Sequence, residues 1–133
     1  MRMWTRHSDA MKLTFTLLQG EYAITKLPAD APIPDWIDQT GLVSITRADD
    51  ELSVVSLSNG TPPDADTGWS AMRVDTLAAL DEPGVVMSAV TPISSAGLGV
   101  FVISTHLRDY LLVRTAEMKR VRAALTDAGH SLA

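Results

Sequence analysis

The fold is decided by the segment VFVISTHLRDYLLVR, residues 100–114. Two apolar runs, 100–105 and 110–114, enclose a short polar turn, and this pattern predicts a β-hairpin. Around it the sequence predicts a strand over 69–74, helices over about 83–96 and 116–128, and a short final strand at Ser131-Leu132. The order is βαββαβ with both helices on one sheet face, which predicts a ferredoxin-like α+β module.

The last helix has the clearest periodicity. Met118, Val121, Leu125 and Ala128 recur at helical spacing, and Gly129 is suited to end the helix. In the earlier helix, Pro92 removes one hydrogen-bond donor and pushes against the carbonyl of Ser88, so we expect a kink there.

The N-terminal half is rich in strands and poor in helix. Strands are predicted over 12–18, 22–27, 42–46 and 52–57. Three prolines between Pro28 and Pro34 delete the amide donors that a helix needs, so we expect at most one helical turn near Asp35-Trp36-Ile37. This half is therefore expected to imitate the same sheet without its helical layer. The turn-forming residues of 58–68 suggest a boundary between two units, 11–60 and 68–133.

Length and composition set the class of protein. The 133 residues allow one ordinary domain or two very small ones, and 46% hydrophobic with 20% charged residues is typical of a folded globular chain. The net charge of −5 is shared between the halves and gives no basic face, so no nucleic-acid partner is expected. With no cysteine, signal peptide or membrane-length apolar run, we predict a soluble protein of the cytoplasm, without membrane contact.

The residues offer little support for an enzyme or a metalloprotein. Ser104, His106 and Asp109 share one turn, whereas the members of a catalytic triad usually come from separate elements, so a small hydrolase is kept only as the enzyme alternative. Asp64 and Asp66 lack the further oxygen ligands of a calcium loop, and the three histidines have no ligand spacing. We predict no catalytic residue, no metal and no cofactor.

The start of the first C-terminal helix is a candidate anion site. It follows a strand directly at residues 81–85, and a helix N-terminus presents unpaired amides that suit a carboxylate or phosphate. Gly84 allows close backbone approach. The alternative is an ordinary helix start with acidic residues in its first turn.

Several segments together resemble a known family. Residues 103–113, and with less specificity 44–55, 68–70 and the Pro92 helix, resemble small bacterial tandem ACT-domain proteins, with a match over about residues 12–131. The second module is similar to the regulatory domains of aspartate kinases and to cytosolic arginine sensors of animals. The resemblance implies an ACT domain over 68–133 preceded by a degenerate ACT-like half over 11–60.

The resemblance also implies a function, which is non-enzymatic binding of an amino acid or related metabolite by a homodimer. The ligand's carboxylate would meet the amides near Gly84 and Val85. Its amino group would meet Asp109, with Thr105 and His106 offering further contacts. Three alternatives stay open: a ligand-free structural dimerisation module, a solvated turn without a role, and an Asp109 that merely pairs with the neighbouring arginine.

Overall fold

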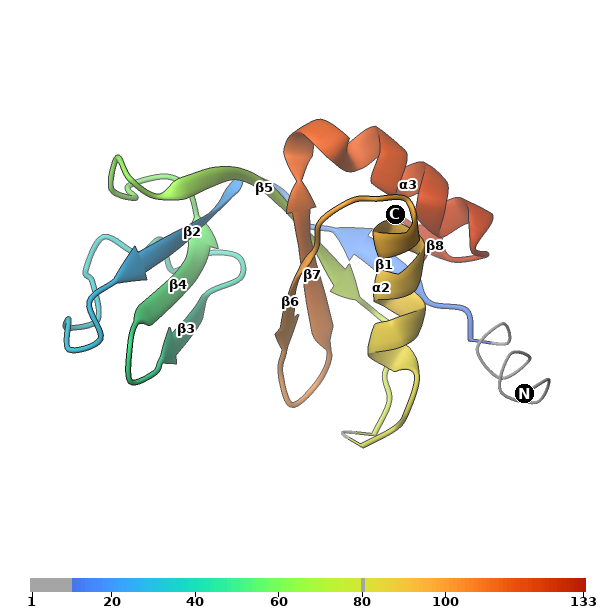
Figure 1. The fold of residues 1–133 in the computed structure, drawn as a ribbon, viewed down its shortest axis with the longest axis horizontal. Helices are drawn as coiled ribbons and strands as arrows, with labels where there is room; N and C mark the ends of the chain where they lie inside the picture. The colour runs from blue at the N-terminus through green and yellow to red at the C-terminus, as the bar shows by residue number, and fades with distance from the viewer. Residues whose placement is uncertain (1–10, 80) are drawn as a thin grey trace.

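The computed structural model describes residues 11–79 and 81–133, and the strands in this part of the chain form one bent sheet (Figure 1). The order β5-α2-β6-β7-α3-β8 is the predicted βαββαβ arrangement, so the ferredoxin-like α+β class is confirmed. In chain order the elements are β1 (Thr14–Leu17), β2 (Tyr22–Leu27), β3 (Ser44–Arg47), β4 (Leu52–Leu57), β5 (Asp66–Val74), α2 (Val85–Ser95), β6 (Phe101–Ser104), β7 (Asp109–Arg114), a 3₁₀ turn (Thr115–Glu117), α3 (Met118–Asp127) and β8 (Ser131–Leu132).

The larger core lies between the C-terminal part of the sheet and the two helices. Strand β5 pairs antiparallel with β1 and with β7, β6 pairs with β7, and β8 runs parallel to β1. One face of these strands packs against α2 and α3, and each fully buried Leu, Ile or Val there stabilises the fold by roughly 1.5–3 kcal/mol. The fully buried side chains of this core include Phe15, Met72, Val74, Ala89, Ile93, Leu111, Val113, Val121 and Leu125.

Strand β5 joins the two parts of the sheet. It begins at Asp66, three residues before the predicted strand, and its first residues pair with β2 while its later residues pair with β1 and β7. Arg114 donates two hydrogen bonds to Asp66, at 2.7 and 3.1 Å, and its guanidinium lies 4.0 Å from the ring centroid of Trp69. The hydrogen bond from Arg114 lowers the pKa of the Asp66 carboxyl. The ion pair joins the first residue of β5 to the last residue of β7, at the point where the two parts of the sheet meet.

The N-terminal part of the sheet is covered by a loop where the other part has helices. Residues 28–41, all of them described, contain turns and no helix, as the prolines predict. Ile37 and its neighbours pack on buried Leu52 and Val54, and Arg47 donates hydrogen bonds to the carbonyls of Ala29 and Ala31. Because residues 28–41 have no helical hydrogen bonds of their own, these contacts fix the path of this segment.

Strand β1 lies before the expected boundary of the two units, yet it pairs with β5 and β8. The chain therefore crosses from one part of the sheet to the other between β1 and β2 and returns along β5. The division of the chain into 11–60 and 68–133 stays a prediction.

Candidate functional site

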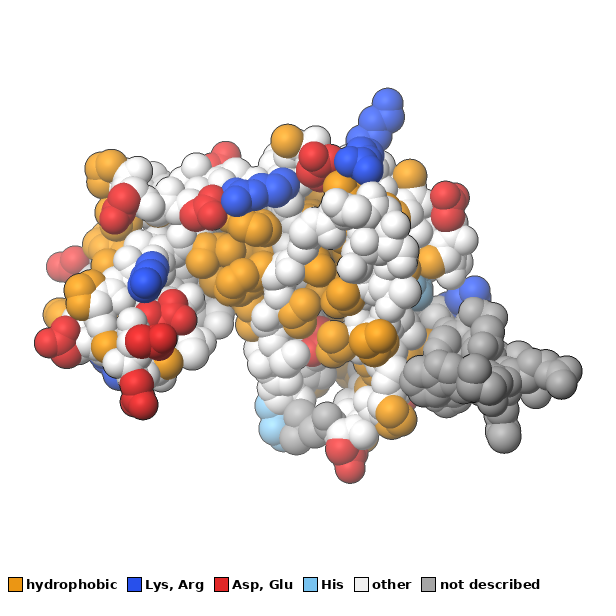
Figure 2. Space-filling model, viewed as in Figure 1, with side chains coloured by type: hydrophobic (Ala, Val, Ile, Leu, Met, Phe, Trp, Pro, Cys, Tyr) orange, Lys and Arg blue, Asp and Glu red, His pale blue; other side chains and the backbone are white. Residues whose placement is uncertain are grey.

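The surface is hollowed between the start of α2 and the β6–β7 hairpin, a region that Figure 2 shows from the same side as Figure 1. The pocket has a volume of about 250 Å³. Its lining includes every residue that the sequence selected as a binding candidate. Gly84 and Val85 come from the start of α2, and Thr105, His106 and Asp109 come from the hairpin about twenty positions later in the chain.

The α2 wall of the pocket is a helix N-terminus without a side-chain cap. Gly84 occupies the N-cap position with φ 92°, a left-handed conformation that favours glycine. The first helical bond runs from the N–H of Ser88 to the carbonyl of Gly84 at 2.9 Å, so the amides of residues 85–87 precede the helical ladder. Val85, Val86 and Met87 line the pocket, and no side chain among the described residues caps this turn. The first turn also holds no acidic residue, contrary to the ordinary helix start considered as the alternative.

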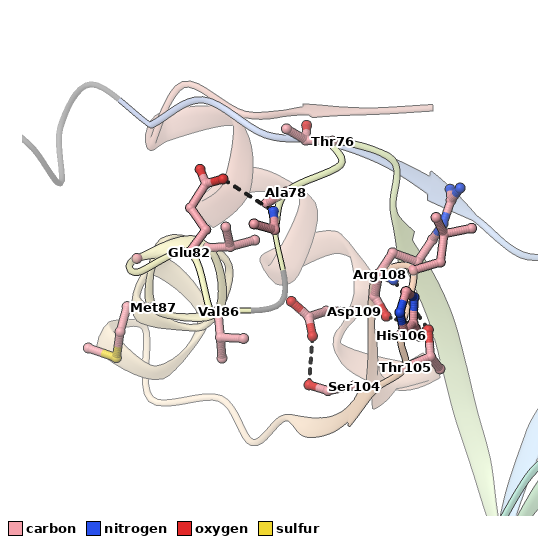
Figure 3. A pocket seen from close by; sticks show the side chains of 14 residues that line it. Thr76, Ala78, Glu82, Val86, Met87, Ser104, Thr105, His106, Arg108 and Asp109 are labelled. Carbon is pink, nitrogen blue, oxygen red and sulfur yellow. Dashed lines mark hydrogen bonds between the residues drawn. The ribbon is translucent and has the colours of Figure 1, made fainter.

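The opposite wall carries the carboxylate of Asp109, which Figure 3 shows between the hairpin and α2. Asp109 is half-buried and pairs across the hairpin with Ser104, whose hydroxyl donates to Asp109 Oδ1 at 2.6 Å. Within the described part of the chain, Oδ2 of Asp109 has no hydrogen-bond partner. This oxygen is thus available to an incoming donor.

The tip of the hairpin is closed by Thr105 and Arg108. The Thr105 hydroxyl donates to the carbonyl of Arg108 at 2.8 Å and accepts the N–H of Arg108 at 3.2 Å, so this hydroxyl is engaged in the turn. His106 is exposed and lies in Figure 3 beside Thr105 and Arg108.

Arg108 pairs with Asp75, at 3.4 Å, so the expected alternative of a structural pair between Arg108 and Asp109 is wrong in this structure. Asp75 also accepts a hydrogen bond from Thr16 at 2.5 Å and one from Arg73 at 2.6 Å. Partial burial by itself would raise the pKa of Asp75. The hydrogen bonds from Thr16 and Arg73 and the charges of both arginines outweigh this effect and hold the pKa below its usual range. The guanidinium of Arg108, a residue that also lines the pocket, is therefore paired with Asp75, and Asp109 has no ion-pair partner among the described residues.

The arrangement offers backbone donors on one wall and a carboxylate on the other. This combination suits a ligand that carries a negative and a positive group a few ångströms apart. Ser104 donates to Asp109, and no hydrogen bond joins Ser104 to His106 among the described residues, so the nucleophile–base contact of a hydrolase is not formed. In the same part of the chain no cluster of three metal-ligating side chains occurs, and no helix is long and apolar enough to cross a membrane.

Sequence reasoning missed some of the lining. Glu82 lines the pocket and accepts the N–H of Ala79 at 3.3 Å, and Met87 lines it with 62% of its surface exposed. Asp75, which holds Arg108, was also missed. The acidic residues before the helix were visible in the sequence, but no local signal shows that Asp75 and Arg108, 33 residues apart, meet.

A second hollow of about 200 Å³ lies between β6 and the β3–β4 pair. It is lined by hydroxyl and apolar side chains without a charged group, so it has no counterpart of the Asp109 carboxylate in the first pocket.

Comparison with known proteins identifies the family. The sequence model of the ACT domain matches residues 64–127, and a model of an N-terminal domain matches residues 20–64. A protein of Agobacterium tumefaciens with a crystal structure is 44% identical, with 93% of this chain and 94% of that chain covered and a TM-score of 0.87. No protein with a curated description matches the sequence significantly.

More distant structures share the fold. One is a Vibrio cholerae protein of unknown function, described as a possible transport protein, at 14% identity and TM-score 0.74, with 93% of this chain and 95% of that chain covered. Another is the ligand-free regulatory subunit of aspartate kinase from Thermus thermophilus, at 11% identity and TM-score 0.54, with 86% of this chain and 96% of that chain covered. From the family match, the near relative and the βαββαβ fold, we conclude that the chain belongs to the ACT-domain family.

Proposed function

We propose that this protein is a non-enzymatic regulatory module that binds a small amino acid, or a related metabolite, in the pocket between α2 and the β6–β7 hairpin. The observation that carries the proposal is the meeting of an uncapped helix N-terminus and an unpaired carboxylate across one hollow of about 250 Å³. The carboxylate of the ligand would accept from the amides after Gly84, and its ammonium group would donate to Asp109.

Membership of the ACT-domain family supports the regulatory part of this proposal. ACT domains are regulatory modules, and the aspartate kinase subunit named above is a regulatory subunit of its enzyme.

We also propose that two copies pair. Four large apolar side chains are exposed beside the pocket, namely Leu77, Val86, Met87 and Leu107, with 38–62% of their surface accessible. Clustered exposed apolar groups are typical of an interaction surface, and two-fold homodimers are the commonest oligomers. A partner over this rim would enclose the pocket. Location in the cytoplasm stays a prediction.

A thermal-shift screen tests the binding proposal. The protein is heated with each of the twenty common amino acids at millimolar concentration, and a specific ligand present at a hundred times its Kd should raise the free energy of unfolding by ~2.7 kcal/mol. A shift with one amino acid, or with a chemically related group, supports the proposal. Equal melting temperatures in every sample would reject amino-acid binding and favour the ligand-free dimerisation module.

A further inference from the structure

Pro92 lies inside the helix α2 and leaves one carbonyl of that helix without its usual donor. In a regular helix the carbonyl of Ser88 would accept the N–H of residue 92, four positions later. That residue is a proline and has no N–H. Ser88 lies directly after the turn that lines the pocket, and its own N–H closes this turn on Gly84 at 2.9 Å.

The missing donor is supplied by a histidine from the other end of the chain. Nε2 of His130 lies 2.8 Å from the carbonyl oxygen of Ser88. Nδ1 of the same ring accepts the N–H of Leu13 at 3.0 Å, which requires Nδ1 to be unprotonated and places the hydrogen on Nε2. The hydrogen-bond partners therefore select the tautomer that donates to Ser88.

His130 is held in place from every side. Only 7% of its surface is exposed, and its ring stands edge-on to Phe15 with centroids 5.6 Å apart. The backbone N–H of His130 donates to the carbonyl of Leu125 near the end of α3, and the backbone N–H of Ser131 donates to the carbonyl of Leu13. Both backbone groups of Leu13 are thus bound to this pair of residues.

We propose that His130 takes over the hydrogen bond that Pro92 withholds and thereby fixes the first turn of α2, which makes His130 a positioning residue of the pocket. Through Leu13 the histidine ties this turn to the strand β1, which belongs to the same sheet as the hairpin that carries Asp109. The distance between the two walls of the pocket is then set before a ligand arrives. The inference rests on the proposed function only where it names the turn as a binding element.

Two conservative variants separate the two hydrogen bonds of the ring. His130→Gln places an amide nitrogen near the position of Nε2, so it can still donate to Ser88. His130→Asn places its oxygen near the position of Nδ1, so it can still accept from Leu13 but does not reach Ser88. Each variant keeps one bond of the ring, and only the first keeps the bond to α2.

Amide hydrogen exchange of the full chain, followed by NMR, measures the effect on α2 without any ligand. The amides of Ser88 and Ala89 should exchange about tenfold faster in His130→Asn than in His130→Gln, whereas the amide of Leu125 in α3 should differ little between the two. Equal exchange of Ser88 in the two variants, or an increase spread evenly over α2 and α3, would overturn the inference.

A background substitution keeps the test decisive if His130→Asn is poorly folded. Pro92→Ala returns an N–H to position 92, so the Ser88 carbonyl regains a partner inside the helix. In this background His130→Asn should accelerate the exchange of Ser88 by less than about threefold over Pro92→Ala alone. The same large acceleration with and without Pro92 would contradict the role given to His130.

Binding is measured on the same variants with the amino acid that raises the melting temperature of the wild type most in the thermal-shift screen. Its Kd should rise by about tenfold in His130→Asn and by less than threefold in His130→Gln, because only the former releases the turn. If no amino acid binds the wild type, the proposed function fails, and the exchange experiment still decides whether His130 fixes α2. Unchanged affinity in a His130→Asn variant with a loosened turn would refute its positioning role.

Discussion

The charge of Asp109 decides between a binding and a structural role for the hairpin. Asp109→Asn keeps the size of the side chain and an oxygen that can accept the Ser104 hydroxyl, so the 2.6 Å bond of the hairpin can be retained. The substitution removes the negative charge that would face a ligand's ammonium group. Since Arg108 is paired with Asp75, the fold loses no ion pair of Asp109.

The expected size of the effect follows from the kind of hydrogen bond that is lost. A bond to a charged group contributes roughly 1.5–3 kcal/mol and a neutral one roughly 0.5–1.5 kcal/mol. The difference of roughly 1–1.5 kcal/mol corresponds to a Kd that is about five to twelve times higher. Because Asp109 is half-buried at the end of a hairpin and contributes no core contact, the melting temperature should change little.

Isothermal titration calorimetry of wild type and Asp109→Asn measures the affinity, with the amino acid found in the thermal screen as titrant. Ser104→Ala is the matched control, because it removes the hydroxyl bonded to Oδ1 and leaves the charge in place. Its Kd should rise by no more than about threefold. An Asp109→Asn protein that melts earlier but binds with wild-type affinity would show that the carboxylate only supports the hairpin.

Three further predictions concern stability and assembly. In urea denaturation, Gly84→Ala should lower the free energy of unfolding by roughly 1–3 kcal/mol, because φ is 92° at this position. The control Gly99→Ala should be nearly neutral, because a Cβ there meets nothing within 4 Å. An equal loss of stability in both variants would contradict the strain argument. The lowered pKa of Asp75 contributes stability at neutral pH that is lost as the pH falls below about 4. The melting temperature of Asp75→Asn should therefore fall less steeply below that pH than the melting temperature of the wild type. An equally steep fall in both proteins would show that other groups cause the loss of stability in acid. Light scattering should give twice the mass of one chain, and Met87→Lys should shift the mass toward one chain; a wild-type monomer at micromolar concentration would reject the proposed pairing.

The elements of the C-terminal module could be predicted because their signals are local. In residues 100–128, apolar side chains form two short runs that predict strands and recur at helical spacing in the segment that predicts a helix. The structure has β6, β7 and α3 in these segments. The prolines of residues 28–34 act equally locally, since each removes a donor from its own backbone. The candidate residues Gly84 and Asp109 were selected from the helix start and from the family resemblance, and the structure places both at one pocket.

The partners of individual side chains could not be predicted in this way. The sequence indicates a free Ser88 carbonyl, because a proline follows four positions later, but it does not show that His130 supplies the donor from 42 residues away. Nothing near Asp75 in the sequence points to Arg108, and the early start of β5 at Asp66 depends on β2 lying beside it.

The physical reason is the range of the interactions. Backbone conformation and hydrophobic periodicity are properties of a few adjacent residues, so this sequence by itself determined the strands, the helices and the irregular proline segment. Hydrogen bonds and ion pairs between distant segments form only where strand pairing and helix packing bring the groups within about 3 Å of each other. The tertiary structure alone therefore decided that Asp109 has no ion-pair partner in the described part of the pocket, that Arg108 pairs with Asp75, and that a histidine after the last helix donates to the first one.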